Sequence, residues 1–220
     1  LEQMDRVSLM DRIDTKFVFE KEMLTSILSE ISSHYYCLEI NKSRVAGYKT
    51  DYFDTLEHKM YHAHHNQKQG RYKIRFREYV GSELSFLEIK YKNNKGKTFK
   101  NRIQAWHDAS FSNKKATDFI QVQSPFDKQE LTHALTNKFN RITLVNKIDE
   151  ERVTIDFSLQ FSRKNQALNL NDLVIIEVKQ ARLNRKSKIM ETLKKNSLRK
   201  FSFSKYAIGM VITDPTLKYN

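Results

Sequence analysis

The sequence predicts an α+β fold in which helices pack on one face of an antiparallel β-sheet and the other face is strongly basic. Three observations support this prediction. Several segments alternate charged and apolar residues with a period of two, which is typical of β-strands. Other segments place apolar residues at helical spacing. The 220 residues include 39 Lys and Arg against 26 Asp and Glu, and much of this excess of +13 follows the alternating segments.

The clearest expected strand covers residues 71–79, where basic and apolar side chains alternate without interruption. Two further segments repeat the pattern on either side of a polar turn at residues 93–96. We therefore expect three consecutive antiparallel strands with a charged face in common. The strands at residues 71–79, 86–92 and 99–103 contribute to this face Arg71, Lys73, Arg75, Arg77, Glu88, Lys90, Lys92, Lys100 and Arg102.

The same alternation recurs elsewhere in the chain, and helices are expected between the strands. Their apolar stripes need an apolar surface to cover, and the uncharged strand faces are the only sizeable ones. The charged faces should therefore lie on the side away from the helices. Further strands are expected at residues 12–19, 44–53, 140–147, 152–157 and 174–179, and helices at residues 21–33, 56–65, 127–139 and 187–197.

A sheet of this size would expose two edges unless it closes into a barrel. Closure would turn the charged faces into a lumen that cannot be dry, because an unpaired ammonium group in a low-dielectric interior costs several kcal/mol. Such a lumen needs water, a multivalent anion and a few balancing carboxylates. The alternation offers Asp14, Glu88, Asp156 and Glu177 for this purpose. The sequence therefore predicts a site for a chain of phosphates.

Composition and motifs exclude several classes of protein. The single Cys37 rules out a disulfide framework and a cysteine-based zinc site, and it suits a reducing compartment. No apolar run approaches the roughly 20 residues that a membrane span needs, so we expect a cytoplasmic protein. The chain has no phosphate-binding glycine loop and no nucleophile triad. Phosphoryl transfer needs neither, because it depends on positioning and on neutralising charge.

Two other interpretations of polar residues are weaker. The cluster His62-x-His64-His65 could bind a metal, but its polar surroundings favour a solvated surface. Nucleic-acid binding through surface charge is disfavoured because the basic residues are patterned on strand faces. We therefore expect no specific nucleic-acid partner.

Eight short motifs in a fixed order resemble the vacuolar transporter chaperone (VTC) domain, a member of the triphosphate tunnel metalloenzymes and a relative of the CYTH proteins. The resemblance runs from about residue 6 to about residue 212 and rests on the order and spacing of the motifs together. They are Arg12-x-Asp14-x-Lys16, Tyr52-Phe53-Asp54-Thr55, Lys73-x-Arg75-x-Arg77, Leu87-Glu88-Ile89-Lys90, Lys100-x-Arg102, Thr154-Ile155-Asp156, Ile176-Glu177-Val178-Lys179 and Ser204-Lys205-Tyr206.

The resemblance implies a fold, an activity and a set of ligands. The fold would be an eight-stranded antiparallel tunnel barrel with helices outside, as one domain over residues 1–220. The activity would be that of a polyphosphate polymerase, which moves the γ-phosphoryl group of ATP onto polyphosphate with Mn²⁺ or Mg²⁺. ATP or another nucleoside triphosphate, triphosphate or polyphosphate, and a membrane-associated partner protein would be its partners.

The resemblance also implies which residues form the site. Lys73, Arg75, Arg77 and Lys205 would be catalytic. Glu177 would carry the metal ion, with Glu88 as a second candidate. The ligands of the phosphates would be Lys16, Lys73, Arg75, Arg77, Lys90, Lys100, Arg102, Arg141, Arg152, Lys179 and Lys205.

Two departures from the family pattern leave other functions open. The first strand has Arg12-x-Asp14-x-Lys16 in place of the Glu-x-Glu-x-Lys of CYTH relatives, which disfavours a hydrolase that uses those glutamates. The segment before Lys205 lacks a further lysine. The alternatives are a non-catalytic polyphosphate- or nucleotide-binding module of a larger assembly, and a tunnel triphosphatase.

Overall fold

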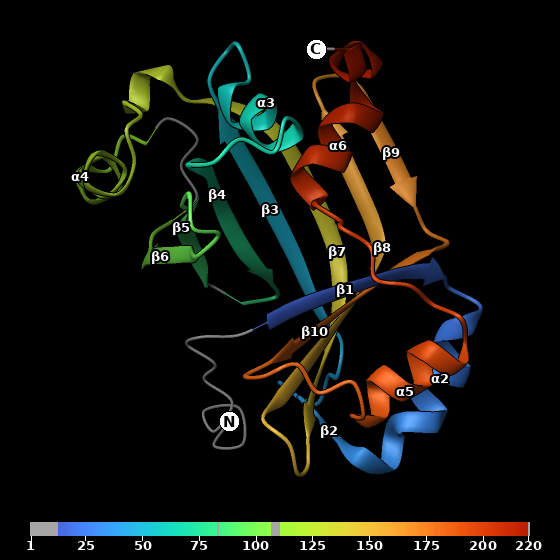
Figure 1. Ribbon diagram of the computed structural model, residues 1–220. Helices are drawn as coiled ribbons and strands as arrows, with labels where there is room; N and C mark the ends of the chain where they lie inside the picture. Colours follow the sequence, from blue (N-terminus) through green and yellow to red (C-terminus); the bar gives the residue numbers. More distant parts are fainter. Residues whose placement is uncertain (1–12, 83, 107–110, 220) are drawn as a thin grey trace. The chain divides into compact units, whose positions relative to one another are not determined.

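The computed structural model describes residues 13–82, 84–106 and 111–219, and Figure 1 shows their helices and strands. The fold is α+β with antiparallel strand pairing, as the alternation of charged and apolar residues predicts. The strands are β1 (Ile13–Glu20), β2 (Tyr35–Cys37), β3 (Ala46–Asp54), β4 (Arg71–Val80), β5 (Ser85–Lys92), β6 (Thr98–Gln104), β7 (Thr132–Asn146), β8 (Glu151–Arg163), β9 (Gln166–Leu170) and β10 (Leu173–Gln180).

The hydrogen-bonded strand order is β1-β10-β8-β7-β3-β4-β5-β6, with β2 added to β7 and β9 added to β8. The predicted antiparallel sheet of eight strands is confirmed by this path of eight, but the prediction that the sheet closes into a barrel is wrong. The described residues form ten strands, and the order ends at β1 on one side and at β6 on the other. The short strands β2 and β9 carry no clear alternation. Charged side chains such as Lys16 on β1 and Lys100 on β6 can protect an open edge without closure.

The helices are α2 (Met23–Ile31), α3 (Lys59–His65), α4 (Lys114–Gln123), α5 (Lys188–Lys195) and α6 (Lys205–Thr213), joined by short 3₁₀ turns η1 (Ser32–His34), η2 (Lys128–Glu130) and η3 (Pro215–Tyr219). Three of the four expected helices are confirmed as α2, α3 and α5. The helix expected at residues 127–139 is wrong, because this segment forms η2 and then enters β7. No helix in the described part of the chain is long and apolar enough to span a membrane.

The chain divides into two compact units, which we describe separately. The first unit comprises the described residues within 1–47, 139–159 and 169–203, and the second those within 48–138, 160–168 and 204–220. The long strands β7 and β8 contribute residues to both units.

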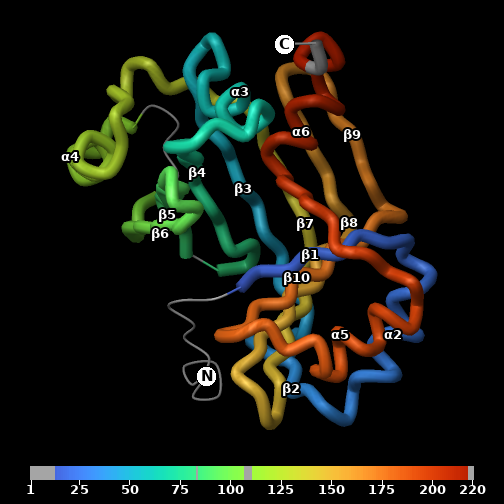
Figure 2. The backbone as a smooth tube through the Cα atoms, in the orientation of Figure 1, coloured from blue at the N-terminus to red at the C-terminus, as the bar shows by residue number. Residues whose placement is uncertain are grey.

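The first unit buries the apolar faces of β1, β8 and β10 beneath α2 and α5, which lie side by side (Figure 2). Phe17, Ile155 and Ile176 from the strands meet Ile27 of α2 and Leu193 of α5 in this core. Burying each of these side chains contributes about 1.5–3 kcal/mol. The core therefore holds the two helices on one face of the sheet and leaves the other face to polar groups.

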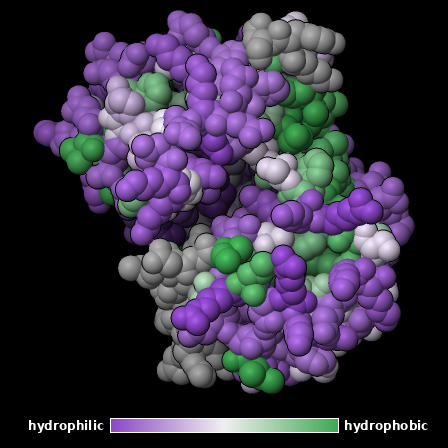
Figure 3. All heavy atoms as spheres, viewed as in Figure 1, coloured by the Kyte–Doolittle hydropathy of each residue, from purple (hydrophilic) through white to green (hydrophobic). Residues whose placement is uncertain are grey.

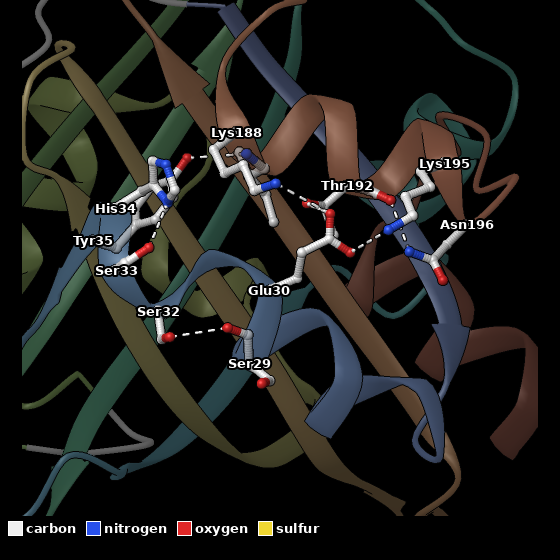
Figure 4. A network of polar contacts seen from close by, with 11 residues as sticks. Ser29, Glu30, Ser32, Ser33, His34, Tyr35, Lys188, Thr192, Lys195 and Asn196 are labelled. Atoms are coloured by element: carbon white, nitrogen blue, oxygen red, sulfur yellow. Dashed lines mark hydrogen bonds and ion pairs between the residues drawn. The ribbon is translucent and has the colours of Figure 1, made fainter.

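A polar network reinforces the packing of the two helices (Figure 4). Glu30 of α2 accepts hydrogen bonds from Lys188 at 3.2 Å, Thr192 at 3.0 Å and Lys195 at 3.3 Å, all of which belong to α5. The two lysines and the threonine lower the pKa of Glu30.

The second unit has its own core between α4 and the apolar faces of β4, β5 and β6. Ile74 and Phe76 of β4, Leu87 of β5 and Ile120 of α4 are fully buried in it. Ile74, Phe76 and Leu87 occupy apolar positions of the predicted alternation. Their basic neighbours in sequence therefore face the opposite side of the sheet.

Candidate functional site

Three neighbouring strands of the second unit place three lysines in one row. The antiparallel register sets Lys73 of β4 opposite Lys90 of β5, and Lys90 opposite Lys100 of β6. Like charges directly opposite one another destabilise a sheet. The row therefore favours an anion bound over it.

The adjacent row contains the carboxylate of Glu88 between Arg75 of β4 and Arg102 of β6. Only 2% of the Glu88 side chain is exposed. Its Oε2 atom accepts a hydrogen bond from Arg75 Nε at 2.8 Å and lies 2.7 Å from Arg75 Nη2 in an ion pair. Its Oε1 atom lies 2.6 Å from Lys100 Nζ, and Arg77 Nη1 lies 3.9 Å from Oε2. One carboxylate thus faces three cations, and the row keeps a net positive charge.

The charges of this row depend on one another. Burial by itself would raise the pKa of Glu88, but Arg75, Arg77 and Lys100 hold that pKa well below its usual range. Burial lowers the pKa of Lys100 to about 8, although Glu88 opposes this change. Glu88 is therefore ionised at neutral pH, and the charge of Lys100 responds to mildly alkaline pH.

Side chains of β3 hold the two arginines from a neighbouring strand. Arg75 Nη1 donates to the Tyr52 hydroxyl at 3.4 Å, and the guanidinium lies 5.9 Å from the centre of that ring. Arg77 Nε donates to Thr50 Oγ1 at 3.4 Å. Sequence reasoning missed both contacts as parts of the site. The period-two spacing of Thr50 and Tyr52 in the expected strand at residues 44–53 could have indicated them.

The start of α6 is attached to the same face of the second unit. Lys73 Nζ donates a 2.8 Å hydrogen bond to Ser204 Oγ, which also caps α6 by accepting from the Ala207 backbone. The buried hydroxyl of Tyr206 donates to Asp54, and burial raises the pKa of Tyr206 well above its ordinary value. Because Lys205 is the first residue of α6, these contacts on either side fix its backbone.

The first unit carries a second polar face in which positive and negative groups alternate. The register sets Lys16 of β1 opposite Glu177 of β10, and Asp14 opposite Lys179. Lys179 donates to Glu177, and Lys16 Nζ lies 3.3 Å from the other oxygen of that carboxylate. Burial would raise the pKa of Glu177, but Lys179 and Lys16 hold it well below its usual value. Burial also lowers the pKa of Lys179.

The same face extends across β8 to β7. Arg141 of β7 binds the carboxylate of Asp156 through two hydrogen bonds, at 2.5 Å from Nε and 2.8 Å from Nη2. On β8, Arg152 pairs in register with Lys179 of β10. Lys179 Nζ donates a hydrogen bond of 3.2 Å to Thr154 Oγ1. The contacts with Asp156 therefore fix the guanidinium of Arg141 within the protein.

The structure groups the expected site residues by unit. Arg12, which belongs to the first expected motif, lies outside the described residues. In the view of Figure 3, hydrophilic residues dominate the visible surface of the chain. The first unit holds Lys16, Arg141, Arg152, Glu177 and Lys179, whereas the second holds Lys73, Arg75, Arg77, Glu88, Lys90, Lys100, Arg102 and Lys205.

Metal ligands are sparse in both units. Across residues 13–82, 84–106 and 111–219, no group of three or more His, Cys, Asp or Glu side chains is placed to hold a metal ion. Glu177 offers one carboxylate that is 19% exposed at its side chain. A divalent ion there would need oxygen ligands from a bound substrate.

Three solved structures are similar to this chain in fold. A candidate adenylate cyclase from Bacillus halodurans has a TM-score of 0.57 and 12% identity, with 96% of this chain and 98% of that chain covered. A candidate adenylyl cyclase from Hippeastrum, described as having a dominant triphosphatase activity, has a TM-score of 0.55 and 14% identity, with 96% and 100% covered. A protein from Pyrococcus horikoshii has a TM-score of 0.52 and 12% identity, with 94% and 99% covered. The chain therefore shares the fold of these three proteins.

The family follows from the sequence match. The VTC domain model matches residues 11–213, so the chain belongs to the VTC domain family. No curated protein matches the chain.

Proposed function

We propose that the chain is a metal-dependent phosphotransferase of the polyphosphate polymerase type, which binds ATP and polyphosphate on its basic strand faces. The face of β4, β5 and β6 supports this proposal most strongly, because its basic residues outnumber its one carboxylate and their mutual repulsion destabilises the sheet unless an anion is bound. We further propose that residues 1–220 act as one tunnel domain, because the family match spans residues of both units. Around Glu88 this face holds Lys73, Arg75, Arg77, Lys90, Lys100 and Arg102.

Phosphoryl transfer requires positioning and charge neutralisation more than covalent help from the protein. A terminal oxygen of polyphosphate would attack the γ-phosphorus of ATP, the bond to the bridging oxygen would break, and ADP would leave with that oxygen. Arg75 and Arg77 suit the transferring group because guanidinium presents several donors in a fixed plane. Lys73 and Lys205 would contact the same phosphates as point charges. In the proposal, phosphates bind in the second unit to Lys90, Lys100 and Arg102, and in the first unit to Lys16, Arg141, Arg152 and Lys179.

We propose Glu177 as the carboxylate that holds Mn²⁺ or Mg²⁺, with phosphate oxygens completing the shell. The ion would supply additional neutralisation of phosphate charge. The contacts of Glu88 argue against the same role there, because its carboxylate is 2% exposed and bound by Arg75 and Lys100. Glu177 is the more exposed of the two carboxylates.

Two alternative functions have specific support. The Hippeastrum protein of the same fold has a dominant triphosphatase activity, which favours hydrolysis as the alternative reaction. The two lysines that neutralise Glu177 favour a module that binds polyphosphate without reacting. Both alternatives predict that phosphate chains bind, but neither predicts a longer product.

The test is incubation with ATP and Mn²⁺ or Mg²⁺, followed by gel electrophoresis with a stain for polyphosphate. We expect a polyphosphate ladder that depends on the metal. Glu177→Gln should reduce its formation by about 100-fold or more, the scale for losing one electrostatic contributor. Metal-free polyphosphate binding should hold or rise in this variant, because a negative charge is removed. Glu191→Gln, an exposed change of the same charge on α5, is the matched control.

Three results would contradict parts of this proposal. Release of orthophosphate without a ladder would indicate the triphosphatase. Tight binding of polyphosphate without any turnover would indicate the binding module. An active Glu177→Gln variant with the wild-type rate would remove Glu177 from the metal site.

A further inference from the structure

Glu88 is in an unusual position for an acidic residue on an anion-binding face. It is almost fully buried and sits in the middle strand of three, with basic residues on both flanking strands. A carboxylate at this place repels any phosphate that approaches the same cations. An unpaired buried charge is costly, so Glu88 depends on its partners as much as they depend on it.

The contacts of Glu88 select particular atoms of its partners. Arg75 gives Glu88 the Nε and Nη2 donors and turns Nη1 towards Tyr52. Two guanidinium nitrogens on one carboxylate oxygen, with the third nitrogen on the Tyr52 hydroxyl, fix the orientation of the arginine plane. Lys100 Nζ meets the other carboxylate oxygen at 2.6 Å. Both cations are therefore held in place before any ligand arrives.

We propose that Glu88 is a positioning residue, an internal counter-ion that fixes Arg75 and Lys100. Its negative charge lowers the affinity of the site for phosphate chains, but it holds the two cations in the orientation that the reaction needs. This inference rests on the proposed function for its effect on turnover, but not for its effect on binding. Removal of the charge should strengthen anion binding and weaken catalysis. A purely structural carboxylate would weaken both on removal, whereas loss of a metal ligand would raise the metal concentration that turnover needs.

The test compares Glu88→Gln and Glu88→Asp with the wild type. Metal-free affinity for tripolyphosphate is measured by calorimetry, and turnover is measured at saturating ATP. Glu88→Gln removes the charge, so affinity should rise about tenfold while turnover falls about tenfold or more. Glu88→Asp keeps the charge but shortens the reach, so affinity should stay near that of the wild type while turnover falls. Glu57→Gln, an exposed change beyond β3, should alter neither quantity.

Several results would overturn the inference and can be told apart from failure of the proposed function. Weaker or unchanged tripolyphosphate binding by a folded Glu88→Gln variant would refute the role of internal counter-ion, whatever the enzyme activity. Unchanged turnover in Glu88→Asp would refute the positioning role. A wild type that binds tripolyphosphate but never transfers phosphate would refute the proposed function alone, and the binding comparison would still decide the role of the charge.

Nuclear magnetic resonance on the wild type keeps the inference testable if Glu88→Gln does not fold. The Arg75 Nε–H group donates to Glu88 in the absence of ligand. Its proton should therefore exchange slowly with water, and it should stay protected when tripolyphosphate is added. Rapid exchange without ligand would show that Glu88 does not fix Arg75.

Discussion

Lys100 has a charge that mildly alkaline pH can remove. Burial lowers its pKa to about 8, so the ammonium form predominates below that pH and the neutral form above it. Bound phosphate stabilises the ammonium form and should raise this pKa again. Binding of phosphate chains is therefore coupled to the protonation of Lys100.

This coupling predicts that tripolyphosphate affinity falls as pH rises through about 8, by up to about tenfold per pH unit. Lys100→Arg should flatten the fall, because arginine stays charged throughout this range. Lys95→Arg, an exposed position in the turn before β6, controls for the ionisation of the ligand itself. Calorimetric titrations from pH 7 to pH 9 measure the difference. Equal slopes for the wild type and Lys100→Arg would contradict the assignment of Lys100 to the site.

At the residue scale, the sequence predicted which basic side chains share a strand face, because the alternation along a strand depends only on neighbouring residues. It did not predict the register that aligns Lys73, Lys90 and Lys100, since this depends on the turns between the strands. The contact of Tyr206 with Asp54 joins residues far apart in the sequence, and no local pattern signals it.

At the scale of elements, α6 depends on a glycine for its close approach to β7 and β8. A β-carbon on Gly209 would overlap side-chain atoms of Leu135 and Phe161, both of which are buried. The helix can therefore approach β7 and β8 only with glycine at this position. The approach also determines where α6 begins, and thus where Lys205 lies.

Gly209→Ala should destabilise the protein by about 1–3 kcal/mol, because overpacking outweighs the roughly 1 kcal/mol that alanine contributes to a helix. Chemical denaturation measures this loss. The double variant Gly209→Ala/Leu135→Ala should lose less free energy of unfolding than the two single variants lose in total, because the smaller side chain at position 135 makes room for the added β-carbon. A Gly209→Ala variant as stable as the wild type would contradict the packing described for α6.

The sequence predicted an element correctly where its apolar residues fitted only one spacing, that of a helix or that of a strand. It predicted the element poorly where the same residues fitted both spacings. Leu131, Leu135 and Phe139 are spaced by four residues, which fits one face of a helix but also one face of a strand. The strand β7 resulted, although a helix was expected. The helix α6 is apolar on most sides and contains β-branched residues, so it lacks the stripe that identifies an amphipathic helix.

At the scale of the whole molecule, the chain has a net charge of +13. The second compact unit carries a strongly basic strand face, whereas positive and negative groups alternate on the face of the first unit. Self-repulsion of the net charge destabilises the folded chain unless an anion balances it. The α+β class and the charged faces could be predicted because they follow from composition and period. The open strand order could not, because it depends on contacts between residues distant in sequence.

The central claim is that these faces bind a chain of phosphates in preference to a single one. Calorimetric titration without metal, with orthophosphate and with tripolyphosphate at low and high salt, tests it most directly. We predict that tripolyphosphate binds at least about 100-fold more tightly, because several cations act together, and that its affinity falls steeply with salt. Arg75→Ala should weaken tripolyphosphate binding. Equal affinities for the two anions, or a tripolyphosphate affinity independent of salt, would contradict the account.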